Sequence, residues 1–571
     1  MYTQHLGRLF WALPLFFLAT FFIANESAAS PETEHFEHWY VDIRKAVNQT
    51  DASGEHLQPS GIIIQDVDGD GHKDLLVSSG YEQYQQPVVV LFNQKGRVGI
   101  NDSAPSFAPF SLDNRTYKSQ SAKIEKICAA DIDKDGCLDF VSAGVQVDKK
   151  IHHVYRNRPV DSVDGAACEG YEKTPTYALN PVTPEETVNS MGFGCAFGDA
   201  DGDGDLDLAV SVAYSDEFSC SGGAPSRCSK GTIAIYENEE GHLNRTSTWQ
   251  ISDDESLIHA GDVQFADVNQ DGVMDLAVSA TGARVYFGEP AEAGSTIKKN
   301  ADYVAPQTAP NTLEYSSGID VGWLDGFSSM AVAISMNNNS DQREDTGLDH
   351  IFVPHKNKLA ETQYHWSSQS RGPGADIRLA NINPRLDVIS ARYAQGEDLQ
   401  GVKNKLSMES AISTCTTPVD ENSSANVYFD IASSGGGGST HQLDGYHKMN
   451  ILGQNIRLSK IGGMFEKRTF TQVLGPRQSV VTIRDPRGQT FISEVLGVTT
   501  KDGQQIAYTR AQGANWVSIP MTKERDKNLK VTVTYLAADN PDVVIADGCG
   551  FIHVFQNPNH ATTSHVSGAR R

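Results

Sequence analysis

The sequence predicts an all-β protein: a seven-bladed β-propeller with an inserted small antiparallel β-module. An acidic nine-residue loop recurs four times, each copy runs into a short apolar segment, and three weaker copies follow. The first residues of the four loops, Asp66, Asp131, Asp199 and Asp267, stand 65, 68 and 68 residues apart. A fixed period with strand-like flanks is typical of repeat architectures.

Each acidic loop has the composition of a calcium site. Positions 1, 3 and 5 carry oxygen side chains, position 7 offers a backbone carbonyl, and position 9 is always Asp. Ca²⁺ takes six to eight oxygen ligands, and the glycine at position 6 permits a sharp turn. Ordinary Asp/Gly turns are the alternative, but four identical spacings favour a metal site. We therefore expect about four Ca²⁺ ions, held by Asp66, Asp68, Asp70, His72 and Asp74; Asp131, Asp133, Asp135, Cys137 and Asp139; Asp199, Asp201, Asp203, Asp205 and Asp207; and Asp267, Asn269, Asp271, Val273 and Asp275.

The segments between the loops read as the strands of propeller blades. Leu75–Val77 and Leu208–Val210 are examples of the apolar runs that follow the loops, and short apolar runs bounded by turn residues indicate buried strands. Three or four strands fit in each period, which is the content of one blade. Decayed copies at 322–326, 381–384 and 539–542 bring the count to seven. The segment around Trp39 is expected to close the ring, and closure removes exposed sheet edges.

The loop pattern, together with Phe197-Gly198 ahead of the third loop, resembles the FG-GAP and VCBS-type repeats found in integrin α-chain propellers and related proteins. The resemblance is strong over about 60–290 and weak over 318–390 and 534–557. It implies a seven-bladed propeller in which each loop binds Ca²⁺ within its blade. The chain departs from integrins in lacking a leg region and a C-terminal transmembrane segment, so integrin-type signalling is not implied.

The expected domain organisation has four parts: a signal peptide at 1–29, blades one to six at 30–400, an inserted β-rich module at 401–533, and the last blade with a tail at 534–571. The insertion alternates apolar and polar residues in runs such as Ser479–Ile483 and Leu529–Tyr535, separated by turn residues. Alternatively, this segment supplies long loops and the outer strands of blades six and seven.

The N-terminus indicates an exported protein, and the net charge bears on its partners. Arg8 precedes an apolar run from Leu9 to Ile23, and Ser27-Ala28-Ala29 fits a cleavage site. An uncleaved membrane anchor is the alternative. The formal net charge of −25 argues against nucleic acid as a partner. We expect a secreted or extracellular location, or the periplasm of a bacterium, and no membrane span in the mature chain.

Eight cysteines, an even number, suit an oxidising compartment. Cys220 and Cys228 are expected to form a local disulfide. The other six cannot be paired from their spacing. A Cys137–Cys168 bridge would brace the second loop, and we offer it as a hypothesis.

No catalytic signature stands out in the sequence. We therefore leave open whether the protein is an enzyme, and favour the view that it is not. The leading hypothesis is a recognition or cell-adhesion module that binds an extracellular or cell-surface protein or glycan, with calcium mainly structural. A carbohydrate-active lyase or dehydratase that uses the propeller funnel is the alternative. A scaffold subunit that docks a partner through the insertion is a third hypothesis.

Overall fold

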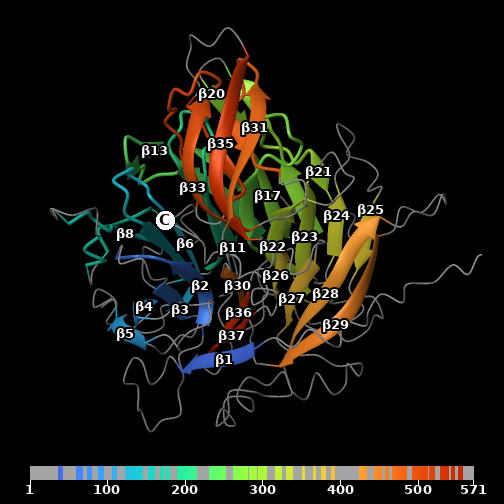
Figure 1. The fold of residues 1–571 in the computed structure, drawn as a ribbon. Coiled ribbons are helices and arrows are strands. Elements are labelled where there is room, and N and C mark those ends of the chain that lie inside the picture. Colours follow the sequence, from blue (N-terminus) through green and yellow to red (C-terminus); the bar gives the residue numbers. More distant parts are fainter. Residues whose placement is uncertain are drawn as a thin grey trace, which may run out of the picture.

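The structure is a computed structural model, and the residues that it describes form strands and turns, with no helix among them (Figure 1). No helix in this part of the chain is long and apolar enough to cross a membrane. The predicted signal peptide at 1–29 lies outside it. The described residues are 37–42, 59–68, 74–79, 88–95, 106–111, 123–145, 152–160, 168–172, 175–180, 190–214, 230–252, 261–280, 282–291, 294–304, 315–323, 330–337, 350–353, 364–367, 374–380, 387–392, 424–433, 443–452, 457–461, 466–484, 491–511, 514–520, 528–538, 542–546 and 551–556.

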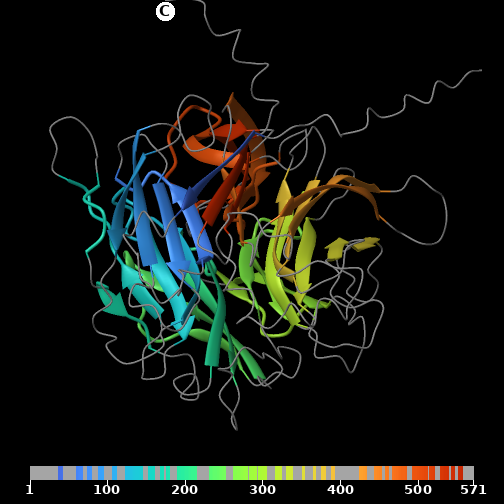
Figure 2. The same cartoon turned by 90° about the horizontal axis from the view of Figure 1, so that it is seen from below.

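Most strands belong to seven four-stranded antiparallel sheets. The first six follow one another in chain order from blue through green to orange in Figure 2, and the seventh combines the red C-terminal strands with the blue strand near the N-terminus. The sheets are β2 (Pro59–Gln65), β3 (Asp74–Ser79), β4 (Val88–Lys95) and β5 (Ser106–Ser111); β6 (Lys123–Ala130), β7 (Asp139–Val145), β8 (His152–Tyr155) and β9 (Tyr177–Ala178); β10 (Ser190–Gly198), β11 (Asp207–Tyr214), β12 (Lys230–Tyr236) and β15 (Trp249–Ser252); β16 (Val263–Ala266), β17 (Asp275–Ala280), β18 (Gly282–Tyr286) and β21 (Tyr303–Val304); β22 (Tyr315–Gly322), β23 (Ala331–Asn337), β24 (His350–Val353) and β25 (Tyr364–Ser367); β26 (Gly374–Ala380), β27 (Asp387–Arg392), β28 (Ser424–Ser433) and β29 (Leu443–Leu452); and β30 (Arg457–Ile461), β36 (Asp542–Ala546), β37 (Phe551–Gln556) and β1 (Glu37–Asp42).

The first strands of the seven sheets make a closed circuit. β2 contacts β6, and contacts continue through β10, β16, β22, β26 and β30, which contacts β2 again. The last sheet combines both ends of the described chain, because β1 pairs antiparallel with β37. The predicted closing strand around Trp39 is therefore confirmed. This arrangement is a β-propeller, as the sequence predicted.

The core lies between neighbouring sheets. The second strands of the first five sheets are buried at every residue whose burial is described, as in β17, where all six residues are buried. One apolar cluster joins the second, third and fourth sheets and includes Leu208, Phe265 and Leu276. Sheets approach so closely that a Cβ on Gly198 would collide with the ring of Phe265. A strand covered on both faces explains why the sequence shows continuous apolar runs there.

Five further strands form a separate unit between β30 and β36, drawn in orange and red at the top of Figure 1. They build a three-stranded and a two-stranded sheet with an apolar core of their own that includes Leu474, Val533 and Tyr535. We call residues 466–538 the inserted module. Its strands are β31 (Glu466–Leu474), β32 (Val480–Thr482), β33 (Phe491–Thr500), β34 (Trp516–Ser518) and β35 (Leu529–Ala538); two hairpins, β13 (Asn238–Glu239) with β14 (His242–Leu243) and β19 (Gly288–Ala291) with β20 (Gly294–Ile297), complete the described strands.

The strands within the expected insertion at 401–533 belong to three different parts of the fold: the sixth sheet, the seventh sheet and the inserted module. β28 and β29 complete the sixth sheet, and β30 is the first strand of the seventh. At the other end β35 extends beyond 533 to Ala538. Within 401–533, the described strands up to Ile461 belong to the sixth and seventh sheets, and those from Glu466 onwards form the inserted module. The module interrupts the seventh sheet between its first and second strands, the place where four other sheets carry the acidic loop.

The described residues contain two disulfides, one within the second sheet and one between the second and third sheets. The Cys137–Cys168 bridge is present and ties the second acidic loop to a segment between β8 and β9, as hypothesised from the sequence. A second bridge, Cys128–Cys195, links β6 to β10. The predicted Cys220–Cys228 pair lies outside the described residues, as do Cys415 and Cys549.

Candidate metal centre

The four acidic loops occupy the same place in four consecutive sheets, the turn from the first strand to the second. The first Asp follows β2, β6, β10 or β16 directly, and the last Asp is the first residue of β3, β7, β11 or β17. We number them loops 1 to 4 in chain order. Asp70 and His72 of loop 1 lie outside the described residues.

Loops 2, 3 and 4 share one internal hydrogen-bond pattern. The position-6 N–H donates to the position-1 carboxylate, at 2.9 Å for Gly136 and Asp131, 3.2 Å in loop 3 and 3.1 Å in loop 4. The position-7 N–H donates to the position-5 carboxylate, at 2.7 Å for Asp205 and Asp203. The position-6 glycines have φ between 82° and 92°, a region that disfavours side chains bearing a Cβ. The sequence therefore folds each loop around its own carboxylates.

The position-9 aspartate is buried in all four loops, and its carboxylate accepts backbone N–H groups of its own sheet. In loop 3, Asp207 accepts the N–H of Ala200 at 2.7 Å and the N–H of Asn238 at 2.9 Å. Asp139 and Asp275 make equivalent pairs of bonds, and Asp74 accepts the N–H of Val67 at 2.7 Å. This carboxylate therefore joins the loop to the end of the third strand.

The asparagine after the third strand reaches back to the loop of the preceding sheet. The Asn157 amide donates to the Val67 carbonyl in loop 1 at 2.8 Å, and the Asn238 amide donates to the Ile132 carbonyl in loop 2 at 2.9 Å. In loop 4 the equivalent Val268 carbonyl instead accepts the backbone N–H of Met330 at 3.0 Å. The loops are thus the joints between successive sheets.

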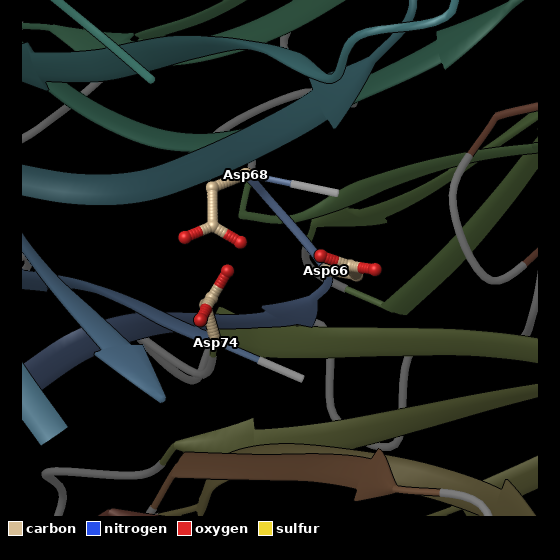
Figure 3. A group of neighbouring side chains, drawn as sticks. All are labelled: Asp66, Asp68 and Asp74. Carbon is tan, nitrogen blue, oxygen red and sulfur yellow. The ribbon is translucent and has the colours of Figure 1, made fainter. Parts of the chain in front are cut away.

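Carboxylates converge in loops 1, 2 and 3 (Figure 3 shows loop 1). In each case one oxygen from each of three aspartates lies within 4.8 Å of the others. These sets of hard oxygen donors fit a cation such as Ca²⁺. The converging residues are Asp66, Asp68 and Asp74; Asp131, Asp133 and Asp139; and Asp199, Asp201 and Asp203.

Loop 4 differs because Asn269 stands at position 3, and its described acidic residues form no such trio. It has another mark of a cation site: Asp267 Oδ1 is buried and accepts no hydrogen bond. An unpaired buried carboxylate oxygen is costly, and a cation ligated there would satisfy it. Asp271 accepts the Val273 N–H at 2.9 Å, which is the same position-7 to position-5 hydrogen bond as in loops 2 and 3.

Burial makes these carboxyl groups hard to ionise without a cation. Burial raises the pKa of Asp199 and Asp267 to about 7, and that of Asp131 to about 6. Burial also raises the pKa of Asp207 and Asp275 well above the ordinary value, and neighbouring aspartates add to the shift. A bound cation would oppose both effects, since it favours the charged form.

The guanidinium of Arg156, the residue after β8, lies against the carboxylates of loop 2. Arg156 Nη1 lies 2.6 Å from Asp139 Oδ2 and 3.2 Å from Asp133 Oδ2. Its Nη2 donates to the carbonyl of Gly241, in the β13–β14 turn of the next sheet. The Arg156 side chain is 6% exposed, so these are buried interactions.

The inserted module lies directly on loops 3 and 4. The hydroxyls of Ser518 and Thr482 donate to the position-1 carboxylates Asp199 and Asp267, the second at 3.2 Å. The N–H groups of Ser479 and Val480 donate to the Gly272 carbonyl at 2.9 and 3.0 Å. A Cβ on Gly204 would collide with Pro520. The module and the two loops therefore share one interface.

The sequence pointed to the carboxylates of the loops but missed the residues that surround them. The repeated endings Leu91-Phe92-Asn93, Tyr155-Arg156-Asn157 and Tyr236-Glu237-Asn238 were a signal for the asparagines. Nothing local marked Thr482 or Ser518, which meet loops more than 200 residues earlier in the chain.

The fold and the loops define a class: a β-propeller whose inter-strand loops carry clustered carboxylates. Residues 66–142, which span loops 1 and 2, match the family model described as FG-GAP-like repeat. The chain is thus a β-propeller that contains an FG-GAP-like repeat, in line with the resemblance. Among curated proteins, none matches the sequence.

Several solved structures are similar in outline. One is the Dos1 propeller, with 9% identity and a TM-score of 0.36 over 92% of this chain and 94% of that one. An exotype rhamnogalacturonan lyase, YesX, has 9% identity and a TM-score of 0.28 over 88% and 90%. A levansucrase from Bacillus subtilis has 8% identity and a TM-score of 0.28 over 57% of this chain and 85% of its own.

Proposed function

We propose that this chain is an exported calcium-binding β-propeller that acts as a recognition or adhesion module for a protein or glycan. The seven four-stranded sheets are its seven blades, and calcium is mainly structural. The position of the loops as joints between sheets carries this proposal. Asn157 links the second sheet to loop 1 and Asn238 links the third sheet to loop 2, and a cation among the carboxylates would brace these joints.

The structural role for calcium follows from how the loop ligands are used. The position-1 and position-9 carboxylates of loops 3 and 4 are buried and hydrogen-bonded within the protein. A cation held by them has little access to an external ligand. The residues proposed to hold it are the predicted loop ligands, in loop 1 Asp66, Asp68 and Asp74 among the described ones.

Three features support the recognition role and the exported location. The chain carries an FG-GAP-like repeat, two disulfides are present, and a module with its own core stands on the propeller. Disulfides persist in oxidising compartments. No feature of the described residues favours the carbohydrate-active alternative.

Binding screens test this proposal. The purified protein is applied to a glycan array and to immobilised extracellular-matrix and cell-surface proteins, in CaCl₂ and in EGTA. We expect a specific ligand in calcium and weaker binding in EGTA, since the scaffold loosens without its ions. The absence of any ligand in both conditions would argue strongly against a recognition role.

A further inference from the structure

The buried guanidinium of Arg156 lies against the carboxylates of loop 2. Nη1 contacts Asp139 and Asp133, two of the three carboxylates that converge in this loop. Arginine has only donors and keeps its charge inside proteins. The guanidinium therefore already supplies positive charge to this site.

The pairing register identifies the equivalent position in the other sheets. Tyr155 pairs with Phe140 as Tyr236 pairs with Leu208, so Arg156 corresponds to Glu237 in the third sheet. The same register gives Phe92 in the first sheet and Phe287 in the fourth. Of these four sheets, only the second has a cationic residue at this position. The third has a carboxylate there instead. Burial raises the pKa of Asp201, the hydrogen bond from the Asp203 N–H lowers it, and the negative charge of Glu237 raises it further.

A divalent ion ligated by Asp133 and Asp139 would lie within a few ångströms of the guanidinium. Like charges at that separation repel strongly where water is scarce. To admit the ion, Arg156 would have to leave a pocket in which it also donates to the Gly241 carbonyl. Burial of the unpaired guanidinium elsewhere would be costly.

Loop 2 also has supports that need no ion. The Cys137–Cys168 disulfide anchors its position 7. The β13–β14 turn covers it so closely that a Cβ on Gly241 would lie 2.8 Å from Asp133 Cβ. Lys134 pairs with Asp205 of loop 3. The loop is thus closed by covalent, steric and ionic contacts.

We propose that Arg156 takes the place of calcium in loop 2, so that the chain binds ions at loops 1, 3 and 4 only. This inference rests on the proposed calcium binding and changes the expected number of ions from four to three. Loop 2 is then a permanent joint, whereas the other three joints depend on calcium.

Native mass spectrometry of the full-length protein in CaCl₂ counts the ions directly. We expect three in the wild type and three in Asp131→Asn, which alters only loop 2. Arg156→Gln should bind four, and the double variant Arg156→Gln/Asp131→Asn should return to three. Arg158→Gln removes an exposed arginine two residues away and should leave the count at three.

Four ions in the wild type, falling to three in Asp131→Asn, would overturn the inference and leave the proposed calcium binding intact. An unchanged count in Arg156→Gln would also overturn it. No bound ion in any variant would overturn both the inference and the calcium proposal.

Thermal melting checks that the variants fold and gives a second readout. Arg156→Gln should melt lower than wild type in EGTA and recover most of the difference in CaCl₂. A loss of equal size in both conditions would show that Arg156 is only a structural ion pair. If Arg156→Gln does not fold in either condition, the wild-type and Asp131→Asn counts still decide the question.

Discussion

At the scale of single residues, the position-9 aspartates have two separate tasks. Each holds backbone N–H groups of its own sheet, and each is a candidate ligand for calcium. Asp207 shows both most clearly, because it is 1% exposed and accepts two N–H groups. The hydrogen bonds persist without a metal, so the two tasks can be separated by experiment.

We expect Asp207→Ala to lower the free energy of unfolding in EGTA by about 2–5 kcal/mol, because two buried N–H groups lose their acceptor. Asp207→Asn keeps one side-chain oxygen and should lose less. The exposed Asp502→Ala serves as the control and should stay within about 0.5 kcal/mol of wild type. Urea denaturation measures all three. Equal stability of Asp207→Ala and wild type in EGTA would contradict the hydrogen-bonding role.

The position-1 aspartates predict a pH dependence that calcium reverses. Burial raises the folded-state pKa of Asp199 and Asp267 to about 7, from the ordinary aspartate value of 3.8. Without calcium, their contribution to stability is complete below about pH 4 and is lost as pH rises towards 7, because the unfolded chain releases these protons first. Calcium binds the ionised form and offsets that loss.

The increase in melting temperature on adding CaCl₂ should therefore be larger at pH 8 than at pH 5. Differential scanning fluorimetry at both pH values, with CaCl₂ or EGTA, measures it. Asp267→Asn removes one of the two groups and should reduce the difference. A calcium effect of the same size at both pH values would contradict this account.

At the scale of elements, loops 3 and 4 form part of the interface between the inserted module and the propeller. Its backbone bonds to the Gly272 carbonyl, and Thr482 bonds to Asp267. Trp516 packs into the propeller core and donates to the Phe265 carbonyl at 3.2 Å. Loosening the two loops should therefore loosen the module's contact edge while its own core persists.

We expect calcium removal to speed amide hydrogen exchange at 478–483 and 516–519, the segments that face the loops. Strand β33 packs within the module core and is the internal control, with little change expected. Mass-spectrometric hydrogen exchange in CaCl₂ and EGTA compares them. Unchanged exchange at 478–483 would show that docking of the module does not depend on the metal sites.

The sequence predicted the acidic loops, the strands around them and the closing strand, because each has a local pattern. The limits of the module were not predictable in the same way. β30 has apolar residues only at Leu458 and Ile461, without the alternation of a typical strand, and only its pairing with β36, some 80 residues later, assigns it to the seventh sheet. Arg156 was missed for a similar reason, since its contacts with Asp133 and Gly241 depend on how two sheets pack.

At the scale of the whole molecule, the ring closes through strands from both ends of the described chain, β1 and β37. Each sheet contacts the next, so a weakened joint affects its neighbours on both sides. Three of the joints are proposed to depend on calcium. Ligand bound only by the folded state adds about 2.7 kcal/mol per site at a hundred times the dissociation constant.

The most direct test of calcium as the brace of the ring is the melting temperature of the full-length protein by calorimetry, as a function of free calcium. We predict a large decrease in EGTA, full recovery on adding CaCl₂, and a continued rise with calcium concentration. A melting temperature that is the same in EGTA and in CaCl₂ would contradict the account.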